Sequence, residues 1–323
     1  MENCILFDWL TFTSKCDGIG SLISLLGLES VTFEELPRGR NGYKSMMTWE
    51  GISILSDGRE DMGICVDMTG KGCRTFETYA TTSWDDLFAV LLSDPDYNVS
   101  RLDVAMDDHT GILDIDELRD DTDDHHYISK SRKWMVQYGS EGCTIYHGSQ
   151  QSNMLIRIYD KAAEKNIDGH WVRVEMQMRD EIATGFLSGM PAEGLGAHAC
   201  GVLNNYLRYV DPDEGKNMSR WPMTAYWDQF SQSMRAIRCW SAPGVDYDLM
   251  HLSNYIINQV GNALDCYIKI FGVADLVREL GARSIRPSPK YLRLQREYEK
   301  LQKQLKELAE GGYCLLYTSD AAD

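Results

Sequence analysis

The segment Ile156-Arg157-Ile158-Tyr159-Asp160-Lys161 alternates apolar and polar side chains, which is the pattern of a half-buried β-strand. On such a strand Tyr159 lies between two cations, Arg157 and Lys161, that share its face. Segments with carboxylates stand before and after it in the chain. A tyrosine beside cations, with carboxylates on nearby strands, is suited to breaking a phosphodiester.

Two further segments alternate in the same way, RLDVAMDD (101–108) and WVRVEMQMR (171–179). In each segment one face is apolar and predicts contact with a core, while the other face carries charged side chains. If both strands belong to one sheet, their charged faces lie on the same side. These faces contribute Arg101, Asp103, Asp107, Arg173 and Glu175.

The sequence predicts an α+β fold, in which a mainly antiparallel sheet is followed by a helical region and a basic C-terminal helix. Short alternating segments and turn signals in the first 80 residues predict strands and turns there. Ser83, followed by two acids and an apolar run, predicts a helix, and a short helix is expected near 115–119. From about Glu181 the apolar period becomes helical. Further strands are expected at 134–139, 143–148 and 154–161.

We expect four parts along the chain. Residues 1–190 form the antiparallel-sheet domain with the chemistry, 191–275 a helical region, and 276–313 a hinge and a basic helix. The last ten residues, CLLYTSDAAD (314–323), resemble the translation of a sequencing-library adapter, so we treat them as non-native. We therefore expect the natural chain to differ after Tyr313.

The basic helix carries apolar residues at the a and d positions of three heptads between 291 and 308. Such a helix either pairs with another helix or docks on its own domain. We expect a homodimer, with a host helicase or a coupling protein as a further partner. The cations near the hinge that we expect to contact DNA are Arg283, Arg286 and Lys290.

Composition restricts the class of protein. A formal net charge of −17 argues against a general nucleic-acid coat, because nonspecific affinity comes from phosphates neutralised by Lys and Arg. Any DNA contact is therefore expected to be local. The nine cysteines contain no CxxC pair, which favours reduced, structural thiols. No apolar run reaches the roughly 18 residues of a membrane span, so we expect a soluble, cytoplasmic protein with no membrane contact.

Carboxylates on the charged faces predict a metal site. Asp103, Asp107 and Glu175 offer only oxygen ligands, which suit Mg²⁺ or Mn²⁺. Tyr159 is the candidate nucleophile, but a free phenol has a pKa near ~10 and needs a cation or a metal to attack. The structural alternative is that the tyrosine packs on its strand and the acids form an ordinary solvated face.

Four segments carry a family resemblance. MTGKGCRTFE (68–77), RLDVAMDD (101–108), TIYHGSQQSNMLIRIYDKAAE (144–164) and VRVEMQMR (172–179) occur in the order seen in the Rep-trans type replication initiation factors. This family includes rolling-circle plasmid initiators and relaxases of related integrative conjugative elements. The resemblance extends over roughly residues 5 to 270, and its motifs are most specific in the middle third.

The resemblance implies a metal-dependent endonuclease that nicks and rejoins one DNA strand at an origin. Tyr159 matches the tyrosine that becomes linked to the 5′ phosphate, while Asp103 and Glu175 match the acidic positions that hold the ion, with Asp107 as a third candidate. The implied partner is origin DNA, single-stranded or extruded as a hairpin. Conjugative members often carry an N-terminal helix-turn-helix that does not fit before the first strand, so we expect recognition by the sheet, through Arg101 and Arg173, and by the C-terminal helices.

Two other functions stay open at this stage. In the first, the carboxylates hold a metal that activates water, and no covalent intermediate forms. In the second, the protein is a non-catalytic replication adaptor whose basic helix recruits a partner. The choice between plasmid initiator and conjugative relaxase is also open.

Overall fold

The computed structural model describes residues 2–15, 18–139, 142–237, 261–282 and 298. The chain forms two compact units, Met1–Pro243 and Gly244–Asp323. In the second unit, the described residues form two helices, α10 (Gly261–Phe271) and α11 (Val273–Ala282). Within the described ranges, no helix has both the length and the apolar character needed to cross a bilayer.

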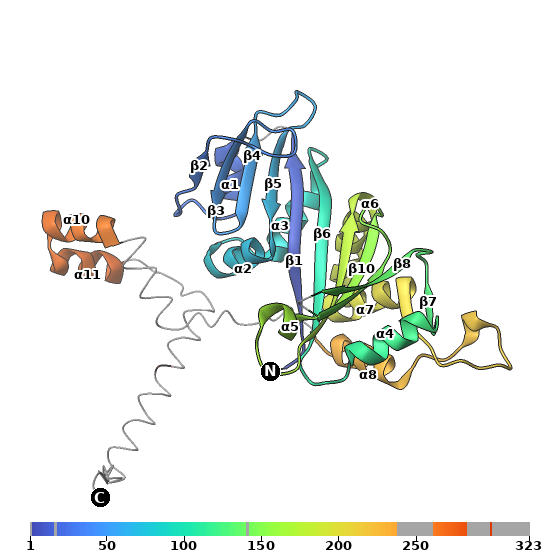
Figure 1. The fold of residues 1–323 in the computed structure, drawn as a ribbon. Helices are drawn as coiled ribbons and strands as arrows, with labels where there is room; N and C mark the ends of the chain where they lie inside the picture. Colours follow the sequence, from blue (N-terminus) through green and yellow to red (C-terminus); the bar gives the residue numbers. More distant parts are fainter. Residues whose placement is uncertain (1, 16–17, 140–141, 238–260, 283–297, 299–323) are drawn as a thin grey trace, which may run out of the picture. The chain divides into compact units, whose positions relative to one another are not determined.

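A ten-stranded antiparallel sheet forms the centre of the first unit (Figure 1). Its strand order is β2-β3-β4-β5-β1-β6-β11-β10-β9-β8, so the three strands of the candidate site are neighbours. This arrangement confirms the predicted α+β class with a mainly antiparallel sheet. The strands are β1 (Cys4–Ser14), β2 (Glu34–Leu36), β3 (Ser45–Trp49), β4 (Ile52–Ser56), β5 (Ile64–Met68), β6 (Tyr97–Asp108), β8 (Trp134–Gly139), β9 (Gly142–His147), β10 (Met154–Asp160) and β11 (Val172–Arg179).

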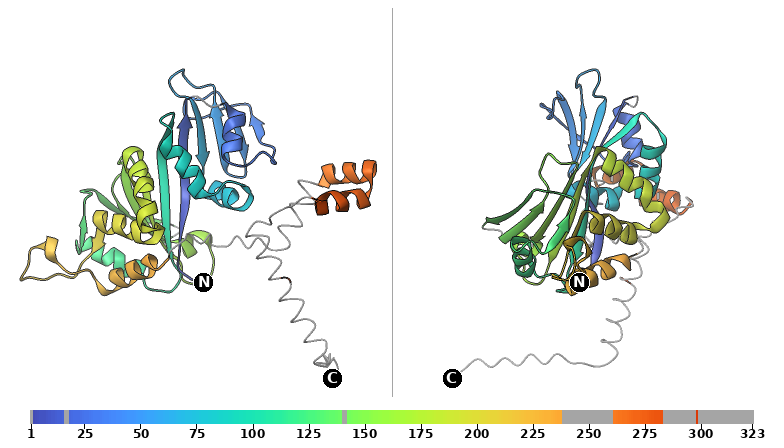
Figure 2. Two further views of the ribbon diagram at one scale, coloured as in Figure 1. Left: turned by 180° about the vertical axis from the view of Figure 1, so that it is seen from behind. Right: turned by 90° about the vertical axis from the view of Figure 1, so that its right-hand side faces the viewer.

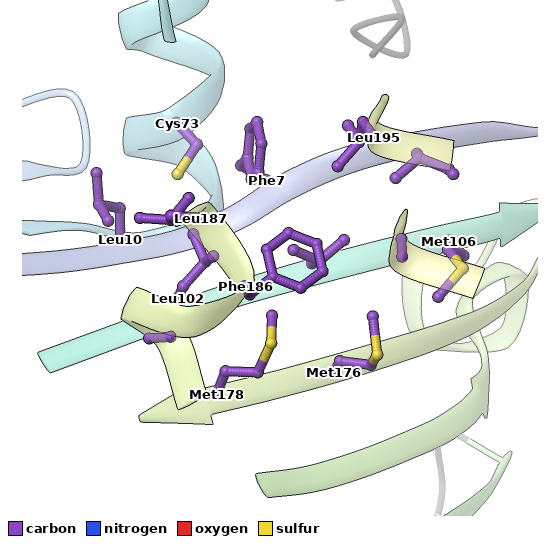
Figure 3. Packing of buried hydrophobic residues seen from close by; sticks show 14 of the residues in the cluster. Phe7, Leu10, Cys73, Leu102, Met106, Met176, Met178, Phe186, Leu187 and Leu195 are labelled. Carbon is purple, nitrogen blue, oxygen red and sulfur yellow. The ribbon is translucent and has the colours of Figure 1, made fainter. Parts of the chain in front are cut away.

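One face of this sheet is apolar and covered by helices. Leu102 and Met106 of β6 and Met176 of β11 pack against Phe186 and other side chains of the helices (Figure 3). In the right-hand view of Figure 2, the helices that follow β11 lie together on one side of the strands. The α-helices among the described residues of this unit are α1 (Ile19–Leu25), α2 (Gly70–Tyr79), α3 (Trp84–Ser93), α4 (Ile115–Asp123), α5 (Lys161–Lys165), α6 (Asp180–Glu193), α7 (Leu195–Tyr206) and α8 (Ala225–Arg235).

The expectation that the first 80 residues hold only strands and turns was wrong, because α1 and α2 lie among them. Helix α2 was not predicted because it contains two glycines, and glycine is a poor helix former. Gly72 has a packing role, because a Cβ there would lie 2.3 Å from the carbonyl oxygen of Gly51 in the β3–β4 turn. Thr69 caps the helix by accepting a hydrogen bond from the backbone N–H of Gly72. Tight packing against that turn thus overrides the local propensity.

The helix predicted after Ser83 is confirmed as α3, and the Ser83 hydroxyl caps it by accepting from the backbone N–H of Asp86 at 3.1 Å. The short helix near 115–119 is α4, which extends to Asp123. Residue 190, where we expected the catalytic domain to end, lies inside α6. The predicted heptad helix lies outside the described residues.

A small two-stranded sheet, β7 (Tyr127–Ser129) with β12 (Leu207–Tyr209), is joined to the large one by a buried hydrogen-bond chain. The Thr122 hydroxyl donates to the carbonyl oxygen of Leu118, so the Tyr209 hydroxyl must donate to Thr122, at 2.7 Å. His147 Nε2, 3.1 Å from the Tyr209 oxygen, is then the protonated ring nitrogen. Burial lowers the pKa of His147 to about 3, which keeps the imidazole neutral.

Replacing His147 should make folding less sensitive to acid. Since its folded pKa lies below the unfolded value near ~6.5, the unfolded state binds the extra proton between these values. This contribution to stability is complete above the unfolded pKa and is lost as pH falls, by about 1.4 kcal/mol per pH unit. His147→Gln keeps a donor for Tyr209, so urea unfolding should show the advantage of the wild type shrinking between about pH 7 and pH 5.

The exposed His125 provides the matched control. His125→Asn should leave the pH dependence of the free energy of unfolding unchanged, because no buried group is removed. A constant difference between wild type and His147→Gln across this range would contradict a buried neutral imidazole.

Candidate functional site

The strand register brings the charged residues to the face opposite the helices. Tyr159 lies directly across from Arg173, and Arg157 lies across from Glu175. On its other side, Glu175 faces Ala105 of β6. Directly opposed residues on antiparallel strands project to the same face. The alternation that the sequence predicted for these three strands is therefore confirmed, and their charged sides form one surface.

A cavity of about 430 Å³ lies on this surface. Of the predicted catalytic and metal-binding residues, only Asp107 does not line it. The floor comes from β6, β10 and β11, and the walls come from β1, β9 and the first turns of α2 and α5. The lining residues are Asp8, Trp9, Gly70, Arg101, Asp103, Thr144, Tyr146, Arg157, Tyr159, Lys161, Glu164 and Glu175.

Tyr159 is held by charged neighbours through its hydroxyl. The hydroxyl donates to Glu175 Oε2 at 3.2 Å and accepts from Lys161 Nζ at 3.3 Å. The Arg157 guanidinium carbon lies 5.8 Å from the ring centroid. Burial raises the pKa of Tyr159 well above its ordinary value, and the Glu175 charge raises it further, while Arg173 and Arg157 oppose this effect. The phenol therefore keeps its proton unless more positive charge enters the cavity.

Asp103 and Glu175 are the buried carboxylates of the cavity, each only 1% exposed. Asp103 accepts two hydrogen bonds from Arg101, at 2.9 and 2.6 Å, and Glu175 forms an ion pair with Arg157. Burial, followed by the neighbouring Glu175 charge, raises the pKa of Asp103 to about 7 despite its arginine. Burial is the main cause of this raised pKa, and a cation bound beside the carboxylate would oppose it. These two oxygen donors fit a hard divalent cation such as Mg²⁺ or Mn²⁺.

Asp107 and Arg173 have a different environment. Both oxygens of Asp107 accept from Arg173, at 2.6 and 2.8 Å, and the third donor of Arg173 binds Asp8 at 2.9 Å. Asp107 is fully buried and Arg173 is 4% exposed. Neither side chain lines the cavity. In this structure Asp107 is thus committed to Arg173, and Arg173 is not accessible to a DNA strand.

A cluster of Cys4, Asp107 and His109 brings three potential metal ligands within 4.8 Å of one another. Burial, followed by the Asp107 charge, raises the pKa of the Cys4 thiol to about 12, so this sulfur keeps its proton. Asp107 already accepts two bonds from Arg173. A cysteine binds a metal as its thiolate, and none of these three residues lines the cavity, whereas Asp103 and Glu175 do. The cluster therefore suits a cation less well than Asp103 and Glu175 do.

Sequence reasoning missed two residues of β1 that line the cavity, Asp8 and Trp9. A β-bulge between Phe7 and Trp9 places Asp8 as an extra residue, after which Trp9 lies across from Asp103. The Arg101 guanidinium carbon sits 4.1 Å from the Trp9 ring centroid. The sequence does indicate this bulge, because Phe7 and Leu10 are three residues apart, whereas strict alternation places apolar residues two or four apart.

The other expected DNA contacts divide in two groups. Arg101 lines the cavity, beside Asp103. The cations of the hinge lie outside the described residues, and their expected role stays a prediction: Arg283, Arg286 and Lys290.

Comparisons with known proteins agree with this geometry. Residues 97–280 match the family described as "Replication initiation factor", and residues 4–91 match the "Rolling Circle replication initiation protein N-terminal domain". The first match spans more than half of the chain. The chain belongs to the replication initiation factor family.

Two relatives of this replication initiation factor are informative. The "Putative DNA relaxase NicK" of Bacillus subtilis (strain 168) is 26% identical over 263 residues, which is 75% of this chain and 74% of the relative. The structure of a rolling circle replication initiator protein from Geobacillus stearothermophilus superposes with a TM-score of 0.68 at 30% identity. That match covers 73% of this chain and 98% of the other. The family resemblance seen in the sequence is thereby confirmed.

Removing Arg173 from this replication initiation factor should destabilise the fold rather than only weaken DNA binding. Arg173→Met leaves the buried Asp107 carboxylate without its partner, which should lower the free energy of unfolding by roughly 3–5 kcal/mol. The double change Arg173→Met/Asp107→Leu should recover most of the loss, because no buried charge is left alone. Urea unfolding measures both.

The exposed cation Lys165 is the control for this experiment. Lys165→Met should change the free energy of unfolding by less than about 0.5 kcal/mol. If Arg173→Met were as stable as Lys165→Met, Arg173 would not hold the sheet together.

Proposed function

We propose that this replication initiation factor nicks one strand of an origin through Tyr159, forming a covalent 5′-phosphotyrosine. One observation carries the proposal: the Tyr159 hydroxyl shares a cavity with the two buried carboxylates Asp103 and Glu175 and accepts a hydrogen bond from Lys161. The substrate is origin DNA in single-stranded or extruded form. The reaction starts rolling-circle replication or conjugative transfer of a mobile element.

The bond changes follow from the contacts of the phenol. The Tyr159 oxygen attacks the scissile phosphorus, its proton passes to Glu175 Oε2, and the bond from phosphorus to the 3′ oxygen breaks. The phosphate stays on the tyrosine, while the 3′ oxygen takes up a proton from water and becomes the hydroxyl that a polymerase extends. Glu175 releases the phenol proton to water and is again a carboxylate. Because the phosphate ester is stored on the protein, the 3′ hydroxyl can later rejoin it.

Lys161 and Arg157 supply positive charge where the reaction develops negative charge. Lys161 donates to the Tyr159 oxygen itself, so it stabilises the forming phenolate. Arg157 binds Glu175 and lines the cavity, so it can hold a phosphate oxygen. Asp103 and Glu175 would hold Mg²⁺ or Mn²⁺, which supplies Lewis-acid activation of the phosphoryl oxygen.

A second candidate function retains the metal and omits the covalent step. The observation that favours it is the raised pKa of Tyr159, which buried surroundings and Glu175 keep protonated. In that mechanism water attacks the phosphate, and the tyrosine only orients Glu175. The homodimer and the helicase or coupling-protein partner remain proposals that concern residues 276–313, most of which lie outside the described residues.

The exchange Tyr159→Phe should abolish nicking of a supercoiled plasmid that carries the cognate origin, by roughly 10³-fold or more, because the nucleophilic oxygen is lost. Denaturing gels should show labelled DNA attached to the wild-type protein and none attached to Tyr159→Phe. Nicking by Tyr159→Phe at a wild-type rate would exclude the covalent mechanism and favour attack by water.

Metal removal should stop both mechanisms. EDTA is expected to abolish nicking, and added Mg²⁺ or Mn²⁺ should restore it in the wild type. Asp103→Asn should lower the rate by at least about 10²-fold with little change in the free energy of unfolding. Full nicking in EDTA would contradict the assignment of Asp103 and Glu175 as metal ligands.

A further inference from the structure

A second cavity, of about 450 Å³, lies next to the cavity that contains Tyr159, the nicking cavity. Both cavities are on the face of the sheet opposite the helices that cover its apolar side. Tyr146 of β9 lines both cavities. The register places Met135 of β8 across from Tyr146, and Gln137 across from Thr144, which lines the nicking cavity. Met135 and Gln137 line the second cavity. The two cavities therefore follow each other along one surface, from Tyr159 toward the edge strand β8.

The second cavity carries positive charge without matching negative charge. Arg132 and Lys133 line it, and Lys130 stands two residues earlier in the same segment, between β7 and β8. All three side chains are exposed, and none forms an ion pair with any residue that the structure describes. By contrast, the cations of the nicking cavity are each bound to a carboxylate: Arg101, Arg157 and Lys161. Although the chain has a net charge of −17, the three cations beside the second cavity, unpaired among the described residues, form a local site for an anion.

Backbone contacts fix the segment that carries these cations. The backbone N–H of Lys130 donates to the Tyr206 carbonyl at 3.0 Å, and that of Gly148 donates to the Lys133 carbonyl at 2.8 Å. Gly148 has a φ of +119°, and a Cβ there would lie 2.8 Å from the Met154 carbonyl oxygen, so the turn requires glycine. Because these contacts already fix the backbone of residues 130–133, less conformational entropy is lost when a ligand binds there.

Tyr146 adds an aromatic surface at the boundary between the cavities. Its side chain is partly exposed, and its hydroxyl has no hydrogen-bond partner among the described residues. A tyrosine that only served the fold would ordinarily bury its ring or bond its hydroxyl. Aromatic rings beside a cationic groove are the elements with which proteins bind single-stranded nucleic acid without reading its sequence.

We propose that the second cavity binds the single-stranded DNA next to the scissile phosphate. Tyr146 stacks on a base beside the nick, and Arg132 and Lys133 neutralise the phosphates that follow. Charge complementarity supports this occupant, because Arg132 and Lys133 form no ion pair with a described residue and Tyr146 lines both cavities. This inference rests on the proposed nicking function and names where its substrate continues.

The test measures binding of the full chain to a fluorescein-labelled oligodeoxythymidine of about 12 nucleotides, by fluorescence anisotropy at several salt concentrations. Arg132→Gln/Lys133→Gln should bind at least about tenfold more weakly at low salt. The slope of log K against log[salt] should fall by about 1.4, which is about 0.7 for each lost phosphate contact with a single strand. Lys216→Gln/Arg220→Gln removes the same charge from residues that line neither cavity and should keep the wild-type slope.

The aromatic part has its own pair of variants. Tyr146→Leu should weaken binding about fivefold or more, whereas Tyr146→Phe, which keeps the ring, should stay within about twofold of wild type. Equal slopes for the two double variants, or equal affinities for Tyr146→Leu and Tyr146→Phe, would overturn the proposal. The assay needs no strand cleavage, so its failure is distinguishable from a failure of the Tyr159 experiment.

Discussion

Arg173 of β11 binds Asp107 of β6 through two hydrogen bonds and Asp8 of β1 through a third. These contacts join three adjacent strands at the centre of the sheet, on the same face as Tyr159 and Glu175. A buried charge is tolerated only when its partners satisfy it, so the three residues must keep their relative positions. Tyr159 lies across from Arg173, and the position of the proposed nucleophile therefore depends on this ion pair.

The second property of the site is its balance of charge. Arg101 neutralises Asp103 and Arg157 neutralises Glu175, but burial still raises the pKa of Asp103. The cavity can thus accept additional positive charge from a cation. The cations of the segment 130–133 are different, because they face solvent and have no acidic partner in the described chain. A strongly acidic protein can in this way offer one surface with attraction for a polyanion.

Much of this site was predictable because alternation fixes which face a strand residue occupies. The charged faces of β6, β10 and β11 and the group of Tyr159, Asp103 and Glu175 followed from spacing and family resemblance. The ion pair between Asp107 and Arg173 could not be predicted in this way, since a contact between strands depends on strand order and register. Helix α2 was missed because contact with Gly51 outweighs the poor helix propensity of its glycines. Tyr146 gave no signal, since its importance comes from lying between two cavities.

The bulge at Asp8 has a consequence for how β1 can evolve. Phe7 and Leu10 both reach the core only because one extra residue separates them. Deletion of Asp8 would remove the bulge and keep Phe7 and Leu10 on one face. Deletion of a residue from the regular part of the strand, such as Thr11, would instead present Phe12 to solvent. Homologous chains should therefore tolerate loss of the bulge residue more readily than loss of a residue from the regular part of this strand, where one missing codon reverses inside and outside.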